Sequence, residues 1–197
     1  MSESFLGEFA EACRQGKCDL AFDIGANVGE WTVFLGQHFD RVVAVEPDTR
    51  AFEELQLNAA ENCTLHQAAV SHSVGEMNLY RRPSALQSSL LERHPIGAGD
   101  QADAPVLEVQ PVKTLTIDHL AARYGTPDFI KIDVEGAEAD VLQGMSGMKP
   151  RLLIEVHDTA SAVGRQLERL GYDRVRIMRH PSPAAHPQHF WIYADGR

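Results

Sequence analysis

Residues 22–29, which read FDIGANVG, constrain the fold of this chain more than any other segment. They continue a short apolar run, 20–24, and lead into a helical pattern, so we interpret them as a tight turn from a strand into a helix. Glycine permits positive φ and close approach of the backbone, and the first turn of a helix has N–H groups without helical partners. Such a turn is typical of α/β sheets that bind nucleotide-like ligands.

The glycine spacing discriminates between possible cofactors. A dinucleotide fingerprint needs glycines in the pattern G-x-G-x-x-G around a pyrophosphate. Here Asn27 occupies the middle position between Gly25 and Gly29, and Asp23 stands two residues before the first glycine. A carboxylate at that place repels a pyrophosphate but suits an ammonium or sulfonium group. The pattern therefore favours S-adenosylmethionine, whose sulfur and amino group carry positive charge, over NAD.

A second acidic residue follows the next expected strand. Glu46 comes 21 residues after Gly25, and Pro47 cannot donate a hydrogen bond to continue a strand ladder. A carboxylate at this strand end can accept hydrogen bonds from both ribose hydroxyls. Because NAD enzymes use the same device, Glu46 alone does not separate the two cofactors. The residues we assign to cofactor binding are Asp23, Gly25, Asn27, Gly29, Glu46, Ala68 and Asp133.

Length and composition indicate an ordinary enzyme-sized domain. The 197 residues are expected to form one domain, 1–197, and the formal net charge of −10 disfavours a nucleic acid partner. No stretch reaches the roughly 18 consecutive apolar residues of a membrane span. The residues 1–16 lack a basic signal-peptide region, and the three cysteines form no C-x-x-C pair. We therefore expect a cytoplasmic protein with free thiols.

Strand and helix patterns alternate through the chain, and a third strand is expected at 64–69. After it, 75–81 and 106–112 have strand character and indicate a β-hairpin-like insertion. They enclose 83–105, a stretch rich in Gly, Pro, Ser and Ala. We interpret this stretch as a mobile loop that covers the acceptor, and a plain surface loop is the alternative. A helical segment is expected within 1–18.

Three polar residues at strand ends are candidates for catalysis. Asp133 follows a buried apolar strand, and Glu155 and His157 close the next one. Asp133 is the first choice for positioning an acceptor or removing its proton. His157 is expected to titrate near neutral pH, although a structural hydrogen bond is the alternative. A divalent metal held by all three is a further alternative, because carboxylate and imidazole suit Mg²⁺ or Mn²⁺, but we assign no metal ligands.

Several short segments together carry a family resemblance: 23–29, 45–47, 69–71 with Gly75, 88–90 and the most family-specific one, 131–138. On these segments the chain resembles, from about residue 20 to residue 193, the FkbM family of S-adenosylmethionine-dependent methyltransferases. The resemblance implies a class I methyltransferase sheet with strand order 3-2-1-4-5-7-6, in which strand 7 is antiparallel. It also implies O-methyl transfer, often to hydroxyls of sugars, glycolipids or polyketide-like products. Since little chain precedes the first strand, we expect the substrate cap of longer relatives to be reduced to a helix at 5–13 and the mid-chain loop.

The resulting hypothesis is an α/β fold, a class I methyltransferase (Rossmann-like) sandwich. We expect a mostly parallel seven-stranded sheet with an antiparallel edge strand, plus the hairpin-like insertion. The expected function is O-methylation of a small-molecule or glycan acceptor, with a homodimer left open. A dinucleotide-binding oxidoreductase or nucleotide-sugar enzyme is the first alternative, although Asp23 and the missing middle glycine count against it. A non-catalytic S-adenosylmethionine-binding module is the second, although it would not need the acids and histidine on the acceptor side.

Overall fold

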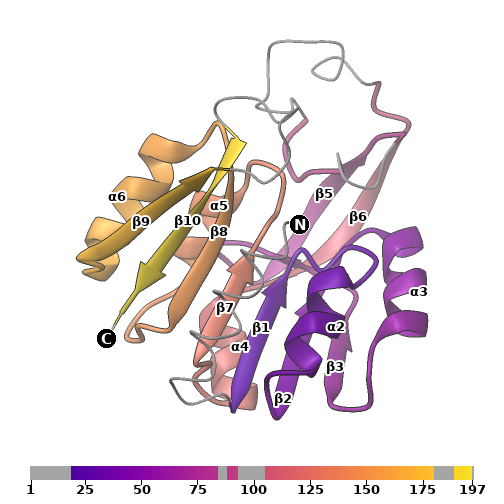
Figure 1. Cartoon of the computed structure of the whole chain (residues 1–197). Coiled ribbons are helices and arrows are strands. Elements are labelled where there is room, and N and C mark those ends of the chain that lie inside the picture. The colour runs from indigo at the N-terminus through magenta and orange to yellow at the C-terminus, as the bar shows by residue number, and fades with distance from the viewer. Residues whose placement is uncertain (1–18, 84–87, 93–104, 180–188, 197) are drawn as a thin grey trace.

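The computed structural model describes residues 19–83, 88–92, 105–179 and 189–196. In these ranges a large β-sheet is flanked by helices, and a smaller sheet stands beside it (Figure 1). The elements run in the order β1 (Leu20–Ile24), α2 (Glu30–Gly36), β2 (Arg41–Val45), α3 (Thr49–Asn58), β3 (Cys63–His66), β4 (Ala69–Val70), β5 (Gly75–Arg81), β6 (Glu108–Leu115), α4 (Ile117–Tyr124), β7 (Phe129–Ile132), α5 (Glu138–Gln143), β8 (Arg151–His157), α6 (Ala160–Leu170), β9 (Arg174–Arg179) and β10 (His189–Asp195).

The large sheet has seven strands in the order β3-β2-β1-β7-β8-β10-β9. The pairs among β3, β2, β1, β7 and β8 are all parallel, whereas β10 is antiparallel to both β8 and β9. The expected mostly parallel seven-stranded sheet is therefore confirmed. The implied strand order 3-2-1-4-5-7-6 with strand 7 antiparallel is confirmed as well. Only the description of this strand as an edge strand is wrong, because β10 lies one position in from the edge. After β8 the chain forms the edge strand β9, and β10 then inserts between β8 and β9. This position gives β10 hydrogen-bonding partners on both sides.

The insertion is a second sheet with the order β4-β6-β5. As expected, β5 and β6 form an antiparallel pair, and β4 adds to β6 in parallel. The third strand predicted at 64–69 is divided, since β3 ends at His66 and the next two-residue strand belongs to the second sheet. The Ala68 N–H turns back to the His66 carbonyl at this point. Ala69 then packs with Leu79 and Val112, so burial against the insertion outweighs continuation of the large sheet.

Alternate residues of the strands pack against helices on opposite faces of the large sheet. Phe22 of β1 belongs to a core that includes buried residues of α4, α5 and α6. Its neighbour Ala21 packs on the other face with Trp31 and Leu35 of α2. Leu55 of α3 contributes to a smaller core beside this second face. Both faces of the parallel strands are therefore covered, which explains why these strands are apolar almost throughout.

A buried ion pair joins the two sheets. Asp48 is the N-cap of α3, where its Oδ1 accepts hydrogen bonds from the N–H groups of Arg50 and Ala51. Its Oδ2 lies 3.0 Å from Nε of Arg81, the last residue of β5. Burial alone would raise the pKa of Asp48, but Arg81 and the N–H groups of α3 hold it below its ordinary value. Asp48 thus caps a helix of the large sheet and anchors the insertion at the same time.

Two predicted segments fall largely on residues that the structure does not describe. The helical segment within 1–18 lies outside the described residues, and so do 84–87 and 93–104 of the predicted mobile loop. The part 88–92 is described and crosses the end of β5, where Ser89 pairs with Tyr80. Among the described helices, none has both the length and the apolar character to cross a bilayer.

Replacing Asp48 with Ala is expected to lower the free energy of unfolding by about 3–5 kcal/mol. Arg81 then loses its buried carboxylate and keeps only Glu108, whose side chain is 55% exposed, and α3 loses its cap. Asp19→Ala is the matched control. It breaks an ion pair with Arg41 whose side chains are 60% and 51% exposed, and should cost less than about 1 kcal/mol. Urea denaturation, followed by circular dichroism, measures the free energy of unfolding of both variants. Equal losses in the two variants would show that the Asp48 pair does not hold the sheets together.

Candidate active site

A cavity of about 580 Å³, open to solvent, lies where β1, β2 and β7 end. The position agrees with the rule that ligands of open α/β sheets bind beyond the carboxyl ends of the strands. The residues that line it are Gly25, Asn27, Val45, Glu46, Pro47, Ala68, Ala69, Val70, Leu79, Ser88, Ser89, Leu90, Asp133, Val134 and Glu135.

The turn after β1 needs glycine for two different reasons. Gly25 has φ 73° and packs so closely on the end of β7 that a Cβ atom would overlap the carbonyl of Asp133. Gly29 has φ 98° and is the N-cap of α2, where a Cβ would come within 2.8 Å of Leu55 Cδ1. Of the two, only Gly25 lines the cavity. Asn27 also lines it and has a positive φ of 49°.

Glu46 is held rigidly at the cavity wall. Its Oε2 accepts a hydrogen bond of 2.8 Å from the Asn27 N–H, and its Oε1 accepts one of 2.8 Å from the Asp48 N–H. The residue is only 7% exposed. Burial raises the pKa of Glu46 to about 7, although the two N–H groups act in the opposite direction. Each oxygen retains a lone pair for a ligand hydroxyl, so this carboxylate is oriented before any ligand arrives.

Asp23 lies below the cavity and not in its wall. It is fully buried, accepts a hydrogen bond of 2.6 Å from Thr32 Oγ1, and lies 3.4 Å from Lys131 Nζ. Lys131 also donates a hydrogen bond of 2.6 Å to the Gly25 carbonyl and lies 3.4 Å from Asp133 Oδ2. The lysine therefore connects the turn after β1 to the end of β7. Its sequence signal was a single cation within the otherwise apolar strand FIKI, and the sequence analysis did not use it.

The structure brings together the three residues predicted on the acceptor side. Asp133 follows β7, while Glu155 and His157 lie on β8. Nε2 of His157 is 3.9 Å from Asp133 Oδ1 and 3.4 Å from Oε2 of Glu135. Asp133 and Glu135 line the cavity, whereas His157 is almost fully buried behind them.

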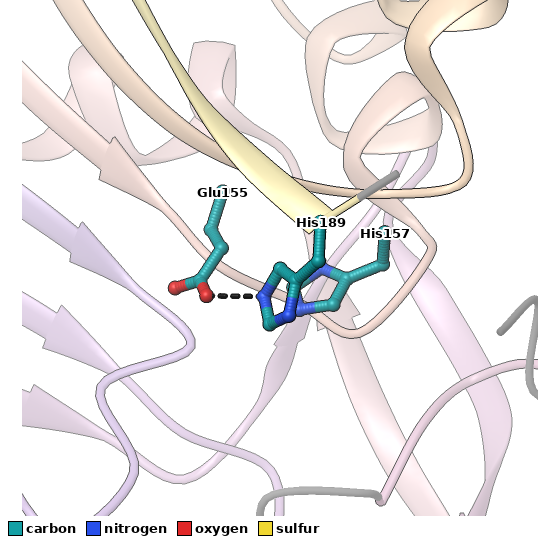
Figure 2. Close-up of side chains that lie close together, drawn as sticks. All are labelled: Glu155, His157 and His189. Carbon is teal, nitrogen blue, oxygen red and sulfur yellow. Dashed lines mark hydrogen bonds and ion pairs between the residues drawn. The ribbon is translucent and has the colours of Figure 1, made fainter. Parts of the chain in front are cut away.

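Two further residues belong to this cluster, and sequence analysis assigned neither to the site. Oε1 of Glu138 lies 2.8 Å from Nδ1 of His157, and His189 of β10 pairs with Glu155 (Figure 2). The rings of His157 and His189 lie 4.4 Å apart, centroid to centroid. Glu138 could have been found from its place in the family-specific segment 131–138. The strand order implied by the family resemblance places the last strand beside β8, but the register that sets His189 opposite His157 appears only in the assembled sheet.

The carboxylates around His157 change its protonation. Burial would lower its pKa, but Glu138, Glu135 and Asp133 together raise it to about 10. His157 is therefore an imidazolium ion at neutral pH in this structure and does not titrate near neutrality as expected. Burial also acts to raise the pKa of Asp133, yet Lys131 and the positive His157 hold it below its usual value. In this arrangement Asp133 is an ionised carboxylate at the cavity wall.

The sequence profile described as Methyltransferase FkbM domain matches residues 23–179. The chain belongs to the FkbM methyltransferase family. This membership indicates S-adenosylmethionine as the cofactor, and it agrees with the family suggested by the sequence motifs. No curated protein sequence matches the chain.

Solved structures support the same fold. A methyltransferase FkbM from Methylobacillus flagellatus KT superposes with a TM-score of 0.62 at 22% identity, over 89% of this chain and 43% of that chain. The present chain therefore spans less than half the length of that relative. A putative methyltransferase from Streptococcus mutans, solved in complex with SAH, superposes with a TM-score of 0.51 at 15% identity, over 100% of both chains. A SAM-dependent O-methyltransferase from Thermotoga maritima superposes with a TM-score of 0.53 at 13% identity, over 99% of this chain and 65% of that chain.

Lys131→Met is expected to destabilise the protein by about 3–5 kcal/mol, because Asp23 and Asp133 lose their shared cation in a buried site. The double variant Lys131→Met/Asp23→Asn should be more stable than Lys131→Met alone by at least about 1 kcal/mol in the free energy of unfolding. The reason is that one of the two carboxylates is then replaced by a neutral amide. Urea unfolding of both single variants and the double variant completes the cycle. If the two substitutions were strictly additive, Lys131 would not be compensating the charge of Asp23.

Proposed function

We propose that this chain is an S-adenosylmethionine-dependent O-methyltransferase that acts on a hydroxyl of a sugar, glycolipid or secondary metabolite. The observation that carries the proposal is the position of Asp133. Its side chain is 25% exposed at the cavity wall, opposite the end of β2 where Glu46 stands, and it is backed by Lys131. A carboxylate in this place is available to an acceptor hydroxyl beside a bound cofactor.

The cavity residues fit S-adenosylmethionine. We assign the ribose hydroxyls to Glu46, whose two oxygens are already oriented by backbone N–H groups. Gly25 and Asn27 expose backbone at the turn, and the apolar wall that includes Ala68 suits a purine ring. Asp23 acts on the cofactor indirectly in this proposal, because Lys131 stands between it and the Gly25 carbonyl. Gly29 contributes by starting α2 in a left-handed conformation.

When bound, S-adenosylmethionine supplies a methyl group on a cationic sulfur, so that an oxygen–carbon bond forms, the carbon–sulfur bond breaks and its electron pair stays on sulfur. Asp133 orients the acceptor hydroxyl and takes its proton. Alignment of this kind supplies several kcal/mol, and a positioned base typically adds about 10²–10⁴-fold. Lys131, 3.4 Å from Asp133 Oδ2, holds the carboxylate in position from behind.

The acceptor class follows from charge and from the size of the cavity. The net charge of −10 opposes binding to a nucleic acid, whose phosphates need a basic surface. The open cavity suits a small molecule or the end of a glycan. A labelled-methyl assay against fractionated cell extract tests the reaction and identifies the acceptor together. Transfer of label to nitrogen or carbon, and to no hydroxyl, would refute O-methylation.

Cofactor affinity should depend on Glu46 and on pH. Glu46→Ala is expected to weaken S-adenosylmethionine binding by about 1.5–3 kcal/mol, the scale of a charged hydrogen bond. Because the pKa of Glu46 is about 7, raising the pH from about 6 to about 8 ionises it and should strengthen binding by up to about tenfold. Asp48 and Lys131, the charged groups near Glu46, should stay ionised over this interval.

Calorimetry across the pH range measures this effect, and Glu46→Gln should flatten the profile while keeping the side chain's shape. Glu53→Ala, an exposed acid of α3, is the control that should leave affinity unchanged. A Glu46→Gln profile as steep as that of the wild type would mean that another group causes the pH dependence.

Asp133→Asn should reduce turnover by about 10²–10⁴-fold, because the variant keeps the shape of the side chain but removes its basicity. Cofactor affinity should change much less, since Glu46 carries most of the polar recognition. Initial rates with the acceptor identified above, together with calorimetry, separate the two effects. Asp40→Asn, at an exposed position outside the cavity, is the control. Full turnover in Asp133→Asn would remove this residue from the reaction.

A further inference from the structure

Three side chains from two neighbouring strands, Glu155, His157 and His189, lie close together (Figure 2). Glu155 and His157 are two residues apart on β8 and so lie on the same face of the sheet. His189 stands directly opposite His157 in the antiparallel pairing of β8 with β10. One ligand atom from each of the three lies within 4.8 Å of the others. The sheet topology itself therefore assembles two imidazoles and one carboxylate.

We propose that Glu155, His157 and His189 bind a divalent transition metal ion. Two imidazoles with one carboxylate suit Mn²⁺, Fe²⁺ or Zn²⁺ better than Mg²⁺ or Ca²⁺, which prefer oxygen ligands alone. In the structure His189 Nε2 and Glu155 Oε1 are in hydrogen-bond contact. The ion would take the place of the proton that these two atoms share. Three protein ligands leave coordination positions open for other oxygens.

The surroundings of His157 are those of a metal-ligating histidine. Glu138 is fully buried, and its Oε1 lies 2.8 Å from His157 Nδ1. The same carboxylate accepts hydrogen bonds from the Gly136 N–H at 2.8 Å and from Thr159 Oγ1 at 2.6 Å, so it cannot turn away. A carboxylate on the far nitrogen fixes the ring and makes the other nitrogen a stronger ligand. The other nitrogen, Nε2, lies 3.9 Å from Asp133 Oδ1 and 3.4 Å from Glu135 Oε2, so it is the nitrogen that remains for an ion.

The cluster contains more carboxylates than positively charged side chains, which favours binding of a cation. Lys131 and the two histidines are outnumbered by nearby carboxylates, those of Asp23, Asp133, Glu135, Glu138 and Glu155. Protons within the cluster can supply the same charge as a divalent ion, so charge alone does not choose between the two. The choice rests on geometry, because one oxygen and two nitrogens on adjacent strands lie within 4.8 Å of one another. Imidazolium ions without a metal are the alternative that the experiment must exclude.

The use of the metal depends on the proposed function, whereas its binding does not. Asp133 lies 3.9 Å from His157 Nε2 and lines the cavity, so an ion at this site lies beside the proposed acceptor. It would hold the acceptor oxygen and lower the pKa of its hydroxyl. The proton would pass to Asp133, and the transfer of the methyl from sulfur to oxygen would be otherwise unchanged.

The test uses the full chain without an affinity tag, stripped by a chelator and then dialysed. Titration with MnCl₂ is followed by calorimetry and by the electron paramagnetic resonance signal of free Mn²⁺. We expect one ion per chain. His189→Gln and Glu155→Gln should each weaken binding at least about tenfold, because each removes a ligand. The control His119→Gln, at an exposed position on α4, should bind like the wild type.

Two results would overturn the site: no Mn²⁺ binding by the wild type at millimolar concentration, or unchanged binding by both folded ligand variants. Circular dichroism verifies that His189→Gln, the least buried of the three positions, remains folded. In a separate arm, chelation should lower labelled-methyl transfer and Mn²⁺ should restore it. Binding without any effect of chelation would overturn only the role in the reaction. If no transfer occurs with any acceptor, the proposed function fails while the binding result still decides the site.

Discussion

The site depends above all on one buried cation. Lys131 is 2% exposed and connects the Gly25 carbonyl to the carboxylates of Asp23 and Asp133. Removing a charge from water is costly, and the cost is offset only when partners of opposite charge surround it. The arrangement locks the turn after β1 against the end of β7. The turn after β1 and the carboxylate of Asp133 thus share one electrostatic support.

The segment 88–92, which pairs with β5 through Ser89 and Tyr80, closes the cavity with polar contacts to the segments after β2 and β7. Ser88 Oγ lies 3.3 Å from Asp48 Oδ2, and Ser89 Oγ donates a hydrogen bond of 2.7 Å to the Glu135 carbonyl. The Asp48–Arg81 ion pair joins β5 to the start of α3. The insertion therefore forms part of the cavity wall, and its attachment residues touch the segments that follow β2 and β7.

Sequence reasoning succeeded where local patterns carry the information. The alternation of strands and helices, the glycine turn and the acidic strand ends predicted the sheet and the cavity edge. It also predicted that Asp133, Glu155 and His157 would meet, since carboxyl ends of parallel strands share an edge. It was wrong about the titration of His157, because the neighbouring carboxylates of Glu135 and Glu138 act through space.

The sequence alone determined the fold class and the family, because the spacing of glycines and acids around strand ends is a local property of the chain. Tertiary structure decided which polar groups face the cavity and which lie beneath it. Asp23 belongs to the most informative motif, yet its side chain is buried against Lys131, which is more than one hundred residues away. The pairing of His157 with His189 depends on the antiparallel return of β10, a choice that hydrogen bonding between strands makes only when the sheet is assembled.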